Sequence, residues 1–129
     1  MLKLFFYIKN ILFIFFYIYP GSLLGLFFYG NLNKQPKLKN YFSFIFLDIS
    51  SNHIYAFLIL SLLGFLNYFK SHKKIIISYF LLTSIILELM HLIIPNRSFE
   101  FEDLYGNILG VLISIIIFNL IQYAKKIFS

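Results

Sequence analysis

The chain has 129 residues and a net charge of +6, and 60% of its residues are hydrophobic whereas only 12% are charged. So few charged residues cannot cover a surface exposed to water, and the composition therefore predicts a single-domain integral membrane protein. The lysines stand at the ends of apolar runs, which argues against nucleic acid as a partner, and the absence of cysteine excludes disulfides, thiolate metal sites and thiol catalysis.

The first apolar run extends from Met1 to Tyr29 and is interrupted at Pro20. A membrane-spanning helix needs about 20 apolar residues. The run fits a helix within Leu4 to Tyr19, or one that is shifted towards Ile11 to Tyr29. It has no cleavage site of small residues, which argues against a signal peptide. We therefore expect an uncleaved first helix that ends or kinks at Pro20.

A polar connection from Gly30 to Asn52 follows the first run. Its segment Tyr41 to Leu47 is apolar but too short to cross a bilayer, so we expect an interfacial or re-entrant segment there. Three later apolar runs predict further helices: His53 to Phe69, Ile75 to Ile94 and Leu104 to Tyr123. We expect Pro95 to end the second of these and Asp103 to cap the start of the third. The predicted fold class is all-α, a bundle of about four transmembrane helices with one interfacial segment between the first two.

The charges between the runs orient this bundle. The connection from Lys70 to Lys74 carries three lysines and no acid, whereas the connection from Pro95 to Asp103 carries three acids and one arginine. Positive charge favours the cytoplasmic side, so we expect both chain termini and the lysine-rich connection there, in the plasma membrane. In this orientation the lysines of the connection before Asn52 would lie outside the cell, which the positive-inside rule disfavours. The inverted orientation would place even more positive charge outside.

The stretch from Ile85 to Ser114 concentrates the polar chemistry of the chain. A carboxylate within an apolar run is costly in a bilayer and marks a candidate functional site. Spacings of three or four residues place polar side chains on one face of each helix, so we expect them to line one outward-facing cavity. The predicted polar cluster is His53, Glu88, His91, Arg97, Asp103 and Asn107. A row of small residues, Gly106, Gly110 and Ser114, would let the last helix pack closely against a neighbour.

Seven residues at fixed spacing resemble the signature of the VanZ-like family of small membrane proteins: Glu88, His91, Pro95, Arg97, Asp103, Asn107 and Gly110. His91 stands where the family usually has glutamine. An upstream acid and histidine of the family are matched by Asp48 and His53, with the acid one residue further away. The resemblance covers about residues 48–116 of a single domain, 1–129. It implies an envelope membrane protein, and the family takes its name from a protein associated with low-level resistance to the glycopeptide teicoplanin.

Three functions remain open from the sequence. We favour a protein without enzymatic activity that binds a lipid-linked or amphipathic anionic ligand, such as a lipid-linked cell-wall precursor, in a polar pocket at the extracytoplasmic face. Arg97 would hold a phosphate or carboxylate unless it pairs with Asp103 or Glu88. The alternatives are an intramembrane enzyme with Glu88 or His91 as acid or base, and a structural subunit that joins a membrane partner or a second copy.

A metal site is the remaining alternative for the polar cluster. Carboxylate and imidazole suit zinc or manganese, so Glu88, His91 and His53 would be the ligands. The glutamine that is usual at position 91 in the VanZ-like family is a poor ligand, and we therefore expect neither a metal nor another cofactor.

Overall fold

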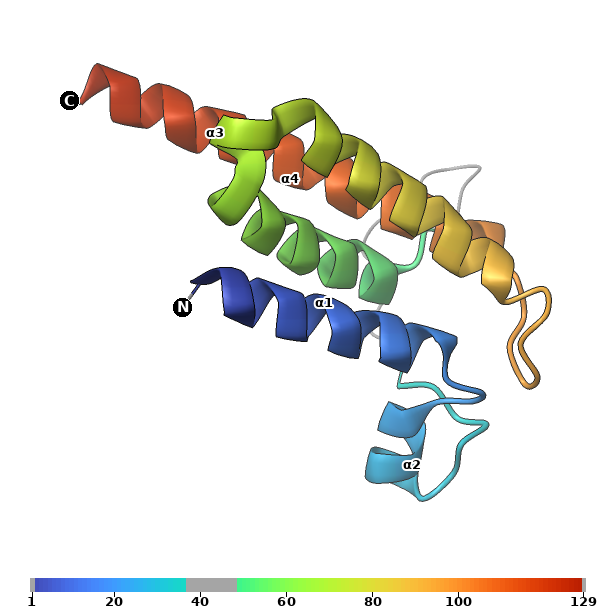
Figure 1. Ribbon diagram of the computed structural model, residues 1–129. Coiled ribbons are helices and arrows are strands. Elements are labelled where there is room, and N and C mark those ends of the chain that lie inside the picture. Colours follow the sequence, from blue (N-terminus) through green and yellow to red (C-terminus); the bar gives the residue numbers. More distant parts are fainter. Residues whose placement is uncertain (1, 37–48, 129) are drawn as a thin grey trace.

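The computed structural model describes residues 2–36 and 49–128 of the chain (Figure 1). All regular structure within these residues is helical: α1 (Leu2–Ile18), α2 (Leu23–Tyr29), α3 (Ser51–Met90) and α4 (Phe101–Ile127). The predicted all-α class is therefore confirmed for the described part of the chain. The expected interfacial segment, Tyr41 to Leu47, and the upstream Asp48 lie outside the described residues.

Helix α1 ends just before Pro20, as the first of the two predicted placements requires. The chain then turns by 80° into the short helix α2. Gly21 lies in this turn with φ of +87°, a conformation that glycine adopts without the clash of a Cβ. The Ser22 side chain caps α2 by accepting a hydrogen bond from the Gly25 N–H at 2.9 Å.

Helix α3 contains two straight halves that meet at a bend. His72, at the bend, has non-helical dihedral angles of φ −140° and ψ 46°. The two halves fold back beside each other (Figure 1), and the rings of Phe65 and Phe80 pack between them with centroids 5.7 Å apart. Both predicted helices are thus present, but the second ends at Met90. Hydrogen-bonded turns continue to Ile94 and stop before the proline, which has no N–H to extend them.

Helix α4 begins at Phe101, and its N-cap residue is Glu100 rather than the predicted Asp103. Asp103 lies within the first turn instead. An acid is favourable there because the helix dipole places partial positive charge at the N-terminus. Since its side chain does not cap the helix, Asp103 is available to face a residue of α3.

Helix α4 packs against the first half of α3 through the row of small residues. A Cβ added at Gly106 would lie 2.7 Å from the carbonyl oxygen of Ser50, the N-cap residue of α3, and one added at Gly110 would lie 2.5 Å from the Ile54 carbonyl oxygen. Ser114 continues the row, and the Ser61 hydroxyl of α3 donates a hydrogen bond to it at 2.7 Å. Glycine is therefore required for the observed distance between the two helices.

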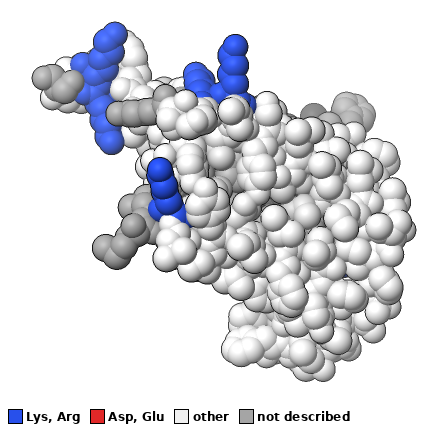
Figure 2. Space-filling model, viewed as in Figure 1, with Lys and Arg blue, Asp and Glu red and all other residues white. Residues whose placement is uncertain are grey.

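The two ends of the bundle differ in charge. Both chain termini and the bend of α3 lie at one end (Figure 1), and the visible lysines gather at that end of an otherwise uncharged face (Figure 2). Among the described residues, only α4 is by itself long and apolar enough to span a membrane, and α1 and α2 pass that test only as a bent pair. The predicted bundle of four spans is therefore not confirmed by length and composition.

Candidate functional site

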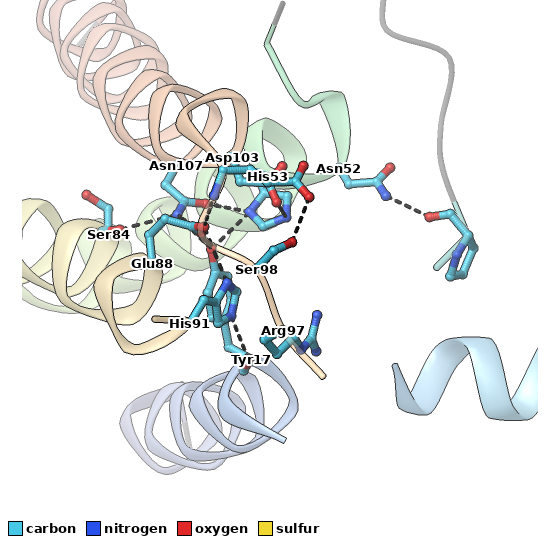
Figure 3. Close-up of polar contacts among 12 residues, drawn as sticks. Tyr17, Asn52, His53, Ser84, Glu88, His91, Arg97, Ser98, Asp103 and Asn107 are labelled. Carbon is cyan, nitrogen blue, oxygen red and sulfur yellow. Dashed lines mark hydrogen bonds and ion pairs between the residues drawn. The ribbon is translucent and has the colours of Figure 1, made fainter. Parts of the chain in front are cut away.

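A buried hydrogen-bond network lies where α1, both halves of α3 and α4 meet (Figure 3). Its centre is the hydroxyl of Tyr17, which donates to Glu88 Oε2 at 2.6 Å. The same hydroxyl accepts from Asn107 Nδ2 at 2.7 Å and lies 3.0 Å from His53 Nδ1. Because these four residues belong to four different helical segments, a single hydroxyl connects the whole bundle.

Glu88 is fully buried, and both of its carboxylate oxygens are surrounded by donors. Oε2 accepts from Tyr17 and lies 3.5 Å from Asn107 Nδ2. Oε1 accepts from the Glu100 N–H at 3.2 Å and lies 3.3 Å from His91 Nδ1. A buried carboxylate is strongly destabilising unless such donors compensate for the lost water. The hydrogen-bonding capacity of Glu88 is therefore satisfied by the chain itself.

His53 connects this network to Asp103. Its Nδ1 lies 2.9 Å from Asn107 Oδ1, and its Nε2 lies 3.2 Å from Asp103 Oδ2. The Tyr17 hydroxyl donates its one hydrogen to Glu88, so both neighbours of Nδ1 are acceptors and this nitrogen carries a hydrogen. The imidazole is thereby held with its Nε2 edge towards the Asp103 carboxylate.

His91 follows α3 directly and contacts α1. Its ring stacks on the ring of Tyr17, with centroids 4.9 Å apart and 12° between the planes. Its Nε2 lies 3.1 Å from the backbone carbonyl oxygen of Tyr17, to which it donates. His91 therefore fixes the tyrosine whose hydroxyl is at the centre of the network.

Arg97 is held by the end of α1, although it lines the same polar cavity as Asp103. Its guanidinium donates to the backbone carbonyls of Tyr19, at 3.2 Å, and Phe16, at 3.4 Å, at the end of α1. Among the described residues no carboxylate oxygen lies within ion-pair distance of it, so the alternative in which Arg97 pairs with Asp103 or Glu88 is not observed. Burial lowers the pKa of the Arg97 guanidinium, but arginine remains protonated at neutral pH in proteins.

Two adjoining cavities open beside the network. A polar cavity of about 280 Å³ lies between the start of α3 and the segment that leads into α4. An apolar cavity of about 510 Å³ lies between α1, α2 and the start of α3. Four polar residues line both cavities: Gln35, Asn52, His53 and Arg97. A polar space and an apolar space therefore meet at a shared wall.

The six residues of the predicted polar cluster all lie at the end of the bundle that holds the two cavities. Four of them line a cavity, and two do not. His53, Arg97 and Asp103 line the polar cavity, and His91 lines the apolar one. Glu88 and Asn107 line neither cavity. These two buried side chains belong to the hydrogen-bond network behind the cavities, so the expectation that all six residues line one cavity stays a prediction.

One group of side chains has the composition of a metal site. His53, Glu88 and Asp103 offer ligand atoms that all lie within 4.8 Å of one another. One imidazole and two carboxylates would suit zinc or manganese. An ion at this position would, however, have to displace the Tyr17 hydroxyl or another donor from Glu88. The geometry fits a hydrogen-bond network better than a preformed metal centre.

Sequence reasoning missed Tyr17, because it is one of ten tyrosines in a chain rich in aromatic residues. One feature of the sequence could have indicated that Tyr17 faces the interior of the bundle. Asn10 is an amide within the apolar run of α1, two helical turns before Tyr17, and both side chains are buried. Asn10 Nδ2 donates to the Tyr79 hydroxyl of α3. A polar residue at this spacing indicates the inward face of α1.

Comparison with known proteins gives one match. The model of the VanZ/LLP1 family matches residues 3–122, which include α1 and α2 as well as the helices that carry the seven-residue signature. No curated protein and no solved structure matches the chain.

Proposed function

This chain belongs to the VanZ/LLP1 family, and on that premise we propose that it is a multi-pass membrane protein that binds an amphipathic ligand with an anionic headgroup. The observation that carries the proposal is the shared wall of the two cavities, at which the protonated Arg97 lies between a polar and an apolar space. A ligand with a charged head and a hydrocarbon body matches this pair of spaces.

Arg97 has the capacity to hold the headgroup. A guanidinium carries five N–H donors, and the residues that the structure describes accept two hydrogen bonds from it, both at backbone carbonyls. The remaining donors allow a fork-like contact with a phosphate or a carboxylate, which is stronger than a contact between neutral groups. The two backbone hydrogen bonds hold the side chain in place before the ligand arrives.

The proposal of four membrane crossings uses helix length alone, since among the described residues only α4 by itself passes the combined test of length and apolar composition. At 1.5 Å per residue, α4 is about 40 Å long, the halves of α3 are about 30 and 27 Å, and α1 is about 26 Å. The hydrocarbon core of a bilayer is about 30 Å thick. With the lysine-bearing end on the cytoplasmic side, the two cavities open at the extracytoplasmic face, where lipid-linked cell-wall precursors are also available.

Native mass spectrometry of the purified full chain tests the proposal, with phosphatidylglycerol as the anionic amphiphile. We expect Arg97→Gln to weaken its binding about tenfold, since a hydrogen bond to a charged group contributes about 1.5–3 kcal/mol. The amide of glutamine retains a donor for the α1 carbonyls, so the variant removes mainly the charge. Arg97→Lys keeps the charge and should retain part of the binding.

Lys73→Gln provides the matched control, because it removes one positive charge at the other end of the bundle. This variant should bind phosphatidylglycerol like the wild type. Equal binding by the wild type and Arg97→Gln would contradict the proposal.

An intramembrane enzyme is the second candidate, and one observation favours it. The contact between His53 Nε2 and the Asp103 carboxylate lines the polar cavity, where a histidine held by a carboxylate could transfer a proton to a bound headgroup. Conversion of a lipid headgroup by the purified protein, abolished in His53→Gln, would establish catalysis in place of simple binding.

A further inference from the structure

The apolar cavity has a composition and a size that the headgroup does not explain. Its volume is about 510 Å³, against about 280 Å³ for the polar cavity. Its walls come from Phe13 and Phe16 of α1, Leu24 and Phe28 of α2, and Ala56 of α3. We propose that this cavity binds one hydrocarbon chain of the ligand and that Ala56 and Phe28 set the chain length it accepts. The inference rests on the proposed function, because a headgroup held at Arg97 determines where the hydrocarbon chain of the ligand enters the cavity.

The shape of the cavity favours a hydrocarbon chain over a protein partner. Cavities that bind small molecules typically have volumes of about 300–1,000 Å³, whereas stable protein interfaces bury more than about 1,000 Å² of surface. The cavity also continues into the polar space through a shared wall of four residues. A lipid fills both spaces with one molecule, because its chain and its headgroup are covalently joined.

Ala56 lies on the path that such a chain would take. It follows His53 by three residues in α3, so both side chains lie on the same face of the helix. His53 lines both cavities, whereas Ala56 lines only the apolar one. A chain that leaves the headgroup at the shared wall therefore passes Ala56 next, and the small side chain leaves room for it.

Phe28 forms the opposite wall. Helix α2 is turned by 80° from α1, and this angle brings one side of the short helix to the cavity. Phe28 lines the cavity although its side chain is 62% exposed, so its ring covers the cavity from outside. Removal of this ring would lengthen the space that is available to the hydrocarbon chain of the ligand.

Competition among phosphatidylglycerols of graded acyl-chain length tests the inference, with native mass spectrometry of the full chain as the measurement. Ala56→Phe fills the cavity and should shift the bound lipids towards shorter chains. Phe28→Ala enlarges the cavity and should shift them towards longer chains. Each methylene expelled from or admitted to the cavity exchanges with lipid or detergent hydrocarbon and not with water, so relative binding changes by less than the factor of about four that corresponds to about 0.8 kcal/mol per CH₂ transferred from water.

Two neighbouring positions provide controls. Ala124→Phe makes the same substitution at the only other alanine of the chain, which is exposed in α4. Phe27→Ala removes the ring next to Phe28, which is 83% exposed and lines neither cavity. Both controls should select the same chain lengths as the wild type. Opposite shifts in the two test variants cannot result from a general loss of folding.

The outcomes separate this inference from the proposed function. No phosphatidylglycerol on the wild type, or equal binding by Arg97→Gln, would overturn the proposed function and this inference with it. Binding that depends on Arg97, together with unchanged chain selection in Ala56→Phe and Phe28→Ala, would overturn only the chain-binding cavity. A bound polypeptide that is displaced by Ala56→Phe would also overturn it.

Discussion

Glu88 places a carboxylate at the centre of an apolar bundle, where the Tyr17 hydroxyl and the Glu100 N–H donate to it. Because these donors belong to the chain itself, we infer that Glu88 organises the network. His91 donates to the Tyr17 carbonyl through Nε2, and its Nδ1 faces Glu88 and carries a second hydrogen only when the imidazole is protonated. A glutamine amide, which is usual at this position in the family, also carries two N–H groups and can meet the same requirement.

Replacement of Glu88 by glutamine tests this organising role. The amide presents an NH₂ group where the carboxylate accepted hydrogen bonds, so donors such as the Tyr17 hydroxyl lose their acceptor. We expect the free energy of unfolding to fall by about 1–3 kcal/mol. The fall is measured as a lower melting temperature of the purified protein, followed by circular dichroism. Glu102→Gln, the same change at an exposed position in α4, should melt like the wild type. Equal melting of the two variants would show that the buried donors do not stabilise the protein.

At the scale of the helices, the contact between α3 and α4 positions the site. His53 lies within this contact, since its Cβ is 2.9 Å from a Cβ added at Gly106, and its ring is 2.9 Å from the side chain of Asn107, the residue after Gly106. The row of small residues that could have joined a partner protein is used within the chain for this contact. The structural-subunit hypothesis therefore loses the surface on which it depended.

Gly110→Ala tests the importance of this close contact. The added methyl group would lie 2.5 Å from the Ile54 carbonyl oxygen and 3.0 Å from the Leu58 nitrogen. Since these are backbone atoms, they cannot rotate away and the helices must separate. We expect a loss of about 1–3 kcal/mol of stability, measured as a lower melting temperature. Leu112→Ala changes a half-exposed residue of the same helix and should have a smaller effect. A variant that melts no lower than wild type would mean that the two helices tolerate a wider separation.

At the scale of the whole molecule, charge separates the two ends of the bundle. Lys73 and Lys74 follow the bend of α3, and Lys125 and Lys126 lie in the last turn of α4, at the end that also holds both termini (Figure 1). Glu100, Glu102 and Asp103, around the start of α4, line the polar cavity at the other end. This polarity predicts how the protein sits in the membrane, because positive segments remain in the cytoplasm.

Single cysteines test this orientation without interference, since the chain has none of its own. A membrane-impermeant thiol reagent applied to intact cells should label Glu102→Cys. It should label Lys73→Cys only after the cells are made permeable. The wild-type chain gives the background level of labelling. Labelling of Lys73→Cys in intact cells would reverse the orientation, and equal access to both positions would exclude four crossings.

The sequence by itself determined the helical class, the family and the place of the polar cluster. Residue type and spacing are sufficient for these, because burial in an apolar environment and the faces of a helix follow directly from them. Tyr17 and the apolar cavity were decided only by the tertiary structure. Ten tyrosines are chemically alike in sequence, and the packing of α1 against α3 selects the one that reaches Glu88. The cavity likewise depends on the 80° turn between α1 and α2, where the Ser22 N–H donates to the Leu32 carbonyl oxygen and the distant Arg97 donates to the Tyr19 carbonyl oxygen.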